Sequence, residues 1–86
     1  MYLHLGNKTI ISSDEIIGIF DLDTATVSKR TRDFLSKNEK NKSIVNVSYE
    51  IPLSFVVCED KEKNKKIYFS PVSSTTLNKR AEENFK

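Results

Sequence analysis

Two apolar runs, residues 53–58 (LSFVVC) and residues 67–70 (IYFS), form the core of the predicted fold. Both are rich in branched and aromatic residues, which favour pleated, half-buried strands. The connection between them, residues 59–66, is charged at seven of its eight positions and must therefore stay in water. Pro71 ends the second run because it cannot donate a hydrogen bond to a neighbouring strand. The stretch predicts a β-hairpin on which the rest of the chain packs.

The chain before this hairpin begins with three further candidate strands. Residues 2–11 contain two short apolar arms around Gly6 and Asn7, a turn signal whose residues tolerate positive φ, and they predict a first hairpin. Residues 12–15 (SSDE) can form and cap a single helical turn. Residues 16–20 (IIGIF) return to strand composition, and the glycine within them predicts a bulge or a close backbone approach.

A helix is predicted in the middle of the chain. Residues 21–24 (DLDT) mark its start, because acidic side chains are favoured near the positive end of a helix dipole. We expect the helix to run from about residue 25 to about residue 38. The positions at helical spacing that form its inward stripe are Val27, Thr31, Phe34, Leu35 and Asn38. A polar link then leads to a candidate strand over residues 44–49.

A last helix follows the central hairpin. Ser73 or Ser74 can cap it, and its apolar seam consists of Leu77, Ala81 and Phe85. The predicted order, β-β-β-α-β-β-β-α, indicates an α+β fold. We expect a single domain over residues 1–86, with a small, mostly antiparallel sheet of about five or six short strands and two α-helices.

Composition excludes several classes of protein. The net charge of the 86 residues is +2, which rules out the signature of a strongly basic nucleic-acid binder but leaves room for a local basic face. We expect no membrane span, because no apolar run approaches about 18 residues, and no signal peptide, because the basic start and apolar stretch are missing. The single cysteine cannot form an intrachain disulfide, which fits a cytoplasmic protein.

The sequence offers few residues for catalysis or metal binding. Asp21 and Asp23 imitate the start of a calcium loop, but its twelfth position would be Arg32 in place of glutamate, so we interpret these acids as helix caps. His4 lacks a nucleophile motif beside it, and Cys58, which ends an apolar strand, reads as a small buried hydrophobe. A redox or nucleophilic role for the cysteine would require an electropositive setting. We therefore expect no enzyme activity, metal, cofactor or small-molecule substrate.

Basic residues on the two predicted helices are the remaining candidates for a binding site. Cations placed on one helix face can contact phosphates, whose neutralisation releases counterions. The alternative is a solvated helix face without a ligand, although repetition of such a face around an oligomer would let weak contacts act together. The candidate DNA-binding residues are Lys29, Arg30 and Arg32 on the first helix and Lys79 and Arg80 on the last.

Three stretches carry a resemblance to a known family: residues 1–6 (MYLHLG), residues 14–21 (DEIIGIFD) and residues 67–81 (IYFSPVSSTTLNKRA). Together they make the chain similar, over nearly its whole length, to the bacterial extracellular matrix regulatory proteins RemA and RemB, and closer to the RemB side. The resemblance implies a small α+β subunit that assembles into a closed ring. In RemA-like members the ring binds DNA and activates genes of the biofilm matrix. Ring closure would also remove exposed sheet edges from a small domain.

The chain departs from the RemA pattern at its arginines. RemA-like members carry an arginine pair just ahead of the inner hairpin strand and another arginine just before the Ile-Ile segment. Here these sites fall near residues 50–52 (EIP) and at Glu15. The roles of those arginines cannot be carried over, so DNA binding would use the helix cations named above.

Two hypotheses follow. The first is a DNA-binding transcriptional regulator of matrix genes that acts as a homo-oligomeric ring and contacts the phosphate backbone of double-stranded DNA. The second is an interaction module that does not bind DNA and regulates by oligomerising or by partnering with a RemA-like protein. The end-to-end resemblance favours the first, whereas the near-neutral charge and the missing arginines favour the second.

Overall fold

The computed structural model describes residues 2–25 and 28–84. Its strands are β1 (Tyr2–Gly6), β2 (Thr9–Ser12), β3 (Ile16–Asp21), β4 (Ile44–Asn46), β5 (Ser54–Glu59) and β6 (Lys65–Ser70). Its helices are the 3-10 turn η1 (Ser13–Glu15) and the α-helices α1 (Leu22–Ala25), α2 (Lys29–Lys40) and α3 (Ser74–Asn84). The α+β class and the predicted order of strands and main helices are confirmed.

The strands form two sheets, whereas the sequence predicted one. β1 and β2 pair as an antiparallel hairpin, and the other strands form a four-stranded sheet in the order β3-β5-β6-β4. β4 runs parallel to β6, and the remaining pairs are antiparallel. β4 ends at Asn46, earlier than the predicted strand over residues 44–49.

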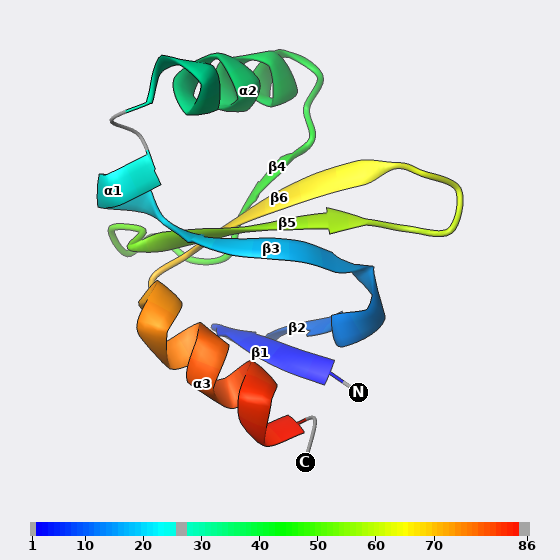
Figure 1. The fold of residues 1–86 in the computed structure, drawn as a ribbon, viewed down its shortest axis with the longest axis vertical. Coiled ribbons are helices and arrows are strands. Elements are labelled where there is room, and N and C mark those ends of the chain that lie inside the picture. Colours follow the sequence, from blue (N-terminus) through cyan, green and yellow to red (C-terminus); the bar gives the residue numbers. More distant parts are fainter. Residues whose placement is uncertain (1, 26–27, 85–86) are drawn as a thin grey trace.

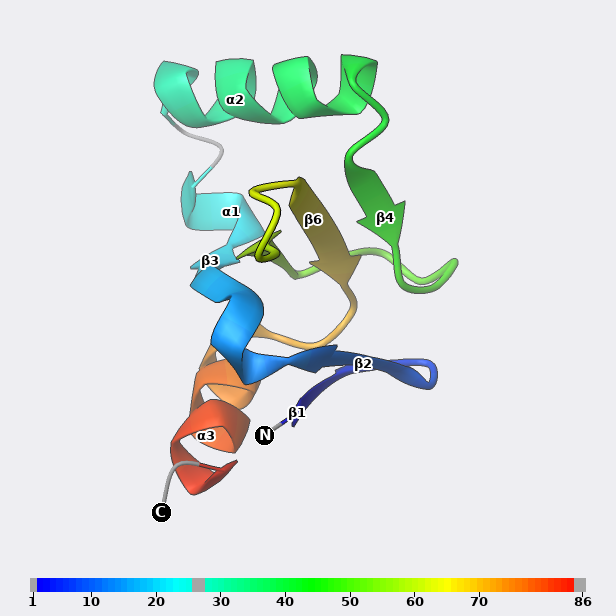
Figure 2. The same ribbon diagram turned by 90° about the vertical axis from the view of Figure 1, so that its right-hand side faces the viewer.

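The molecule has three layers (Figure 1, Figure 2). Helix α2 covers one side of the four-stranded sheet, and the β1-β2 hairpin together with α3 covers the other. We call these the α2 side and the hairpin side. Alternate residues of a strand point to opposite faces of its sheet, so β5 serves both sides: Phe55 and Val57 face α2, and Val56 and Cys58 face the hairpin.

The predicted central hairpin is confirmed. β5 and β6 pair from Ser54 opposite Ser70 to Glu59 opposite Lys65, so both strands extend beyond their apolar residues. The Asp60 carboxylate organises the turn, because its Oδ1 accepts hydrogen bonds from the backbone N–H groups of Glu62 and Asn64, both at 2.9 Å. These bonds, above all the one from the Asn64 backbone, lower the pKa of Asp60.

The predicted continuous helix from about residue 25 is wrong at its start. Asp21 Oδ1 accepts a hydrogen bond from the Thr24 N–H at 3.1 Å, which confirms the capping interpretation for Asp21 at the start of the short helix α1. Asp23 lies in the first turn of that helix. Ser28 then has extended backbone angles, so α2 begins only at Lys29. The predicted stripe residues Phe34 and Leu35 pack on the α2 side of the sheet.

The inward stripe of α2 and the cap of α3 agree with the sequence prediction. Asn38 is buried, and its side-chain amide donates to the Phe34 carbonyl at 2.8 Å, within the predicted stripe. Ser73 Oγ accepts the Thr76 N–H at 3.2 Å and caps α3 as predicted. Val27 and Phe85 lie outside the described residues.

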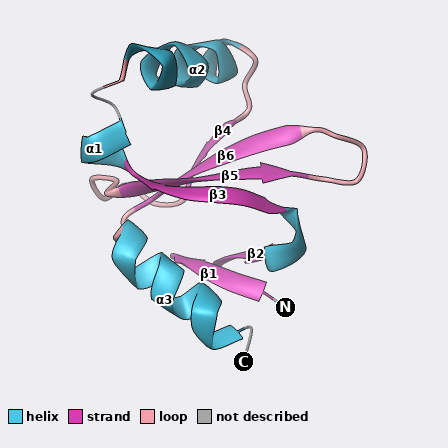
Figure 3. Cartoon of the chain, in the orientation of Figure 1, coloured by secondary structure: helices cyan, strands magenta, loops and turns pink. Residues whose placement is uncertain are grey.

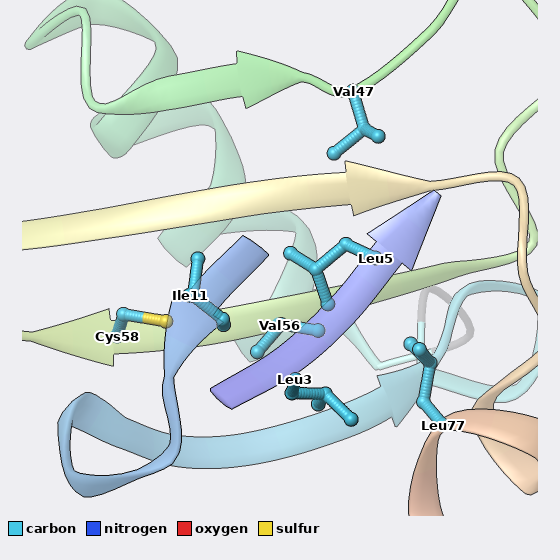
Figure 4. Close-up of a cluster of buried hydrophobic side chains, with 7 residues drawn as sticks. All are labelled: Leu3, Leu5, Ile11, Val47, Val56, Cys58 and Leu77. Carbon is cyan, nitrogen blue, oxygen red and sulfur yellow. The ribbon is translucent and has the colours of Figure 1, made fainter. Parts of the chain in front are cut away.

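The larger hydrophobic cluster lies on the hairpin side (Figure 4). Its buried members come from β1, β2, β5, α3 and the segment after β4, and they are Leu3, Leu5, Ile11, Val47, Val56, Cys58 and Leu77. The smaller cluster on the α2 side has three buried members, Phe55, Val57 and Ile67. Phe34, Leu35 and Leu22 are only half-buried against it.

Side-chain hydrogen bonds join the first hairpin to the larger sheet. The buried Ser70 hydroxyl donates to the Leu5 carbonyl at 2.6 Å, and the Asn7 amide donates to the Val47 carbonyl at 3.1 Å. β1 therefore stays separate from the sheet ladder but is fixed against it. Asn7 and Lys8, both at positive φ, form the hairpin turn next to Gly6.

Candidate nucleic-acid interface

The first turn of α2 is the most cationic helix end in the described chain. Lys29, Arg30 and Arg32 are all exposed, and the described first turn contains no acidic residue. Ser28 makes no side-chain hydrogen bond to cap the helix. The N–H groups of the first turn already give a helix N-terminus positive character, so these cations add charge of the same sign. The arrangement favours an anionic partner.

The three cations of this turn do not point to one place. Arg30 lines an apolar groove between α2 and β3, together with Lys65 on its rim. Lys29 and Arg32 are not part of that lining. Because residues three apart lie on the same helix face, these two cations form a pair on α2 that is directed away from the groove.

A second cationic surface lies on the hairpin side. Lys79 and Arg80 are exposed on α3, as predicted. Arg80 Nη1 donates to the His4 carbonyl at 3.2 Å, which holds the guanidinium beside β1. An open pocket of about 470 Å³ surrounds it, and its polar lining includes His4, Asn7, Lys8 and Arg80.

The structure does not bring the five predicted cations together in one subunit. α2 lies on one side of the four-stranded sheet and α3 on the other (Figure 1). The residues predicted from the sequence therefore form two separate surfaces, the Lys29–Arg32 surface of α2 and the Lys79–Arg80 surface of α3. A straight duplex that lies against one of them would leave the other turned away.

Sequence reasoning missed Lys8 as a member of the α3 surface. The turn after β1 carries Lys8 into the pocket that Arg80 also lines. The Gly6-Asn7 turn signal was present in the sequence, but nothing local connected it with a helix more than 70 residues later. Packing of α3 against β1 brings Arg80 next to Lys8.

Cys58 and Glu15 lie on the hairpin side, where both line a small pocket. The Cys58 side chain is only 4% exposed, and burial, reinforced by the charge of Glu15, raises the pKa of its thiol to about 11. Burial also raises the pKa of Tyr68, which lines the same small pocket. A thiol with such a pKa is almost entirely protonated at neutral pH, so this setting opposes a nucleophilic role for Cys58.

Acidic residues lie in or next to the two places where the RemA pattern has arginines. Glu15 is exposed at the end of η1, and Glu50 is exposed in the segment between β4 and β5. The backbone N–H of Glu50 donates to Ser48 Oγ at 3.2 Å. Both positions carry negative charge in place of positive charge, so neither can supply a phosphate contact.

None of the described helices has the length and apolar character needed to cross a lipid bilayer.

Comparison with known proteins connects this geometry to a family. The model of the RemA-like family, described as extracellular matrix regulatory protein A-like, matches residues 2–81. The chain is also 42% identical over 82 residues to extracellular matrix regulatory protein B of Bacillus subtilis (strain 168), and the match covers 95% of this chain and 91% of that protein. The resemblance inferred from the sequence, with its inclination to the RemB side, is confirmed. The chain belongs to the RemA-like family.

Proposed function

We propose that this protein is a cytoplasmic transcriptional regulator of extracellular matrix (biofilm) genes and acts as a homo-oligomeric ring that contacts the phosphate backbone of DNA. Membership of the RemA-like family and the similarity to a protein named extracellular matrix regulatory protein B support the regulatory role. The proposal includes no enzyme activity. Burial raises the pKa of the Cys58 thiol, which opposes its use as a nucleophile, and the described residues next to His4 form no nucleophile motif.

The proposal that the protein binds DNA rests on the first turn of α2. Exposed cations there coincide with the positive end of a helix and with the absence of acids from that described turn. One such turn offers only two or so phosphate contacts, too few for strong binding. A ring repeats the turn in every subunit, and contacts made together bind far more tightly than each contact alone.

A second candidate function is supported by Glu15 and Glu50. These exposed acids repel phosphates where the RemA pattern has arginines. In this alternative the protein is an accessory subunit that assembles with itself or with a RemA-like regulator and does not touch DNA.

Fluorescence anisotropy with a labelled AT-rich duplex, titrated with protein at several salt concentrations, tests the proposal. We expect binding whose logarithm falls steeply and linearly with the logarithm of the salt concentration. The double variant Lys29→Ala, Arg32→Ala removes two cations and leaves Arg30 in its groove. It should weaken binding and reduce the slope by about 2 per subunit engaged.

The matched control removes two exposed lysines of the central hairpin, Lys61→Ala and Lys66→Ala, which lowers the net charge by the same amount. Its salt slope should equal that of the natural protein. A slope unchanged in the α2 variant would remove that turn from the interface, and the same experiment on Lys8→Ala, Lys79→Ala would test the α3 surface. No binding at low salt would reject the DNA-binding proposal in favour of the accessory subunit.

A further inference from the structure

An apolar groove lies between α2 and the β3 edge of the four-stranded sheet. It has a volume of about 330 Å³, and its apolar lining consists of Ile17, Phe20, Phe34, Phe55 and Val57. Ile17 is 58% exposed and Phe20 is 42% exposed, although both are large hydrophobic residues. Arg30 and Lys65 line it with positive charge. α2 thus leaves part of the apolar sheet surface uncovered.

The bulge in β3 builds this groove. The register with β5 shifts between Ile16 and Gly18, so Ile17 and Phe20, three residues apart, both line the groove, while Ile19 packs in the hairpin-side cluster. The Phe20 ring lies over Gly18, where a Cβ would stand 2.7 Å from the ring. The ring also stacks on Phe55 at 5.1 Å between centroids. An apolar wall is therefore fixed on β3, which is an edge strand of the sheet formed by the described residues.

The segment between β4 and β5 presents the opposite feature, a projecting apolar loop. Tyr49 is fully exposed and Ile51 is 84% exposed, with the exposed acid Glu50 between them. Hydrogen bonds fix the two ends of the segment: the Val47 N–H donates to the Phe69 carbonyl at 3.0 Å, and the Leu53 N–H to the Ser70 carbonyl at 2.8 Å. Figure 3 shows this segment as a loop without regular structure.

We propose that the Tyr49–Ile51 loop of one copy of this chain docks in the α2–β3 groove of the next copy. Tyr49 and Ile51 would cover the apolar wall, and Glu50 would meet Arg30 and Lys65. A pocket of about 300 Å³ or more accepts a group of several side-chain atoms. This inference rests on the proposed homo-oligomeric regulator and supplies the contact that would hold its subunits together.

The position of the two features determines the kind of assembly. In Figure 2, β3 lies on one side of the sheet, and β4 with the green connection that follows it lies on the other. Both ends of the segment are held to β6, and the Leu53 carbonyl also accepts the Leu22 N–H at 3.0 Å. The loop between these anchors projects on the β4 side, away from the groove of its own subunit. A contact between different surfaces of successive copies is head-to-tail, and such contacts generate rings when the rotation closes.

Charge supports a second copy as the occupant. The groove carries cations and the loop carries an acid between its two apolar side chains, so the two surfaces match in both polarity and sign. Apolar surface provides the binding energy of such contacts, while opposite charges steer the encounter and select the partner. An acidic, apolar segment of another protein would share this chemistry, and it is an outcome that the test can reveal.

Size-exclusion chromatography with light scattering, without DNA, tests the contact. The natural protein should have a mass of several subunits at micromolar concentration. Ile51→Asp places a charge on the apolar loop, and Ile17→Asp places a charge in the apolar groove. Each substitution should prevent docking, so each variant alone should have the mass of a monomer. Mixed in equal amounts they should form dimers, because one intact loop then meets one intact groove. Ile10→Asp, at a residue 50% exposed on the first hairpin, is the matched control and should assemble normally.

Charge reversal gives a second test that leaves the apolar residues intact. Glu50→Arg and the pair Arg30→Glu, Lys65→Glu should each weaken assembly, and the triple variant should restore it. Far-ultraviolet circular dichroism of each variant checks that it is folded. A natural protein that is a monomer, or Ile51→Asp and Ile17→Asp variants that both assemble normally, would overturn the inference. Binding of the loop to a different protein's groove would appear as a monomer that assembles only with that protein, and would overturn it as well.

The anisotropy titration separates this inference from the proposed function. Monomeric natural protein that still binds DNA with a steep salt slope would leave the DNA-binding proposal standing without this contact. An assembly that breaks with Ile51→Asp, in a protein that never binds DNA, would leave the contact standing and favour the accessory subunit.

Discussion

The hairpin side and the α2 side of the central sheet are covered to different extents. On the hairpin side, two short strands and α3 bury seven residues in one cluster. On the α2 side, one helix covers three buried sheet residues with half-buried side chains and leaves a groove beside β3. The same strand, β5, supplies residues to both clusters, so the difference comes from what packs on each face.

This difference separates stability from assembly. A fully buried side chain contributes free energy of folding through the apolar area removed from water. A half-covered apolar wall contributes less to the subunit and keeps its remaining area for a partner. We therefore assign most of the folding free energy to the hairpin side and most of the binding surface to the α2 side.

The largest expected effect is at the centre of the hairpin side. Leu5→Ala removes a side chain with no exposed surface and should lower the free energy of unfolding by about 2–5 kcal/mol. Urea denaturation followed by circular dichroism measures it. Ile10→Ala, at a half-exposed residue of the adjacent strand opposite His4, is the control and should cost far less. Equal losses would contradict the assignment of the core to this side.

A smaller loss is expected from the bond that fixes β1 to the sheet. Ser70→Ala leaves the Leu5 carbonyl without its donor at 2.6 Å and the Val72 N–H without its acceptor at 3.0 Å. Buried groups left in this way cost about 1–3 kcal/mol. Ser36→Ala, on an exposed position of α2, is the matched control. If both serine variants unfold at the same urea concentration as the natural protein, the bond does not hold the two sheets together.

The buried Cys58 thiol makes the stability of the hairpin side depend on pH. Unfolded Cys58 ionises near its ordinary pKa of 9.0, whereas the folded thiol keeps its proton until about 11. Its contribution to stability is therefore complete below pH 9 and is lost as the pH rises from 9 to 11. Urea midpoints measured across this range should fall less steeply in Cys58→Val, which has no thiol to ionise. Parallel curves for the two proteins would show that the cysteine does not stay protonated in the fold.

The smallest effect on stability is expected in the groove. Ile17→Ser changes a residue that is more than half exposed and should alter the free energy of unfolding by less than about 0.5 kcal/mol. The same variant should weaken assembly in the light-scattering experiment. A large loss of stability in the isolated subunit would mean that the α2 side is part of the folding core, and the contrast between the two sides would fail.

Local patterns in the sequence account for much of the fold. The alternation of β5 and β6, the bulge at Gly18 and the apolar faces of α2 and α3 all follow from short-range periodicity and backbone preference. The start of α2 does not, because Asp21 caps a short first helix and Ser28 takes an extended conformation directly before Lys29, whereas the acids of residues 21–24 indicate a single helix start. Helix boundaries depend on such details.

The α+β class, the main strands and helices, the family and the candidate surface cations could all be predicted from the amino-acid sequence. Each of these depends on residues close together in the chain or on overall similarity. Three results come from the packing of distant segments: β4 pairs in parallel with β6, α2 and α3 lie on opposite sides of the sheet, and Lys8 lines the same pocket as Arg80. These results depend on which face of the sheet each element covers. Periodicity shows that a helix has an apolar face but does not show where that face packs.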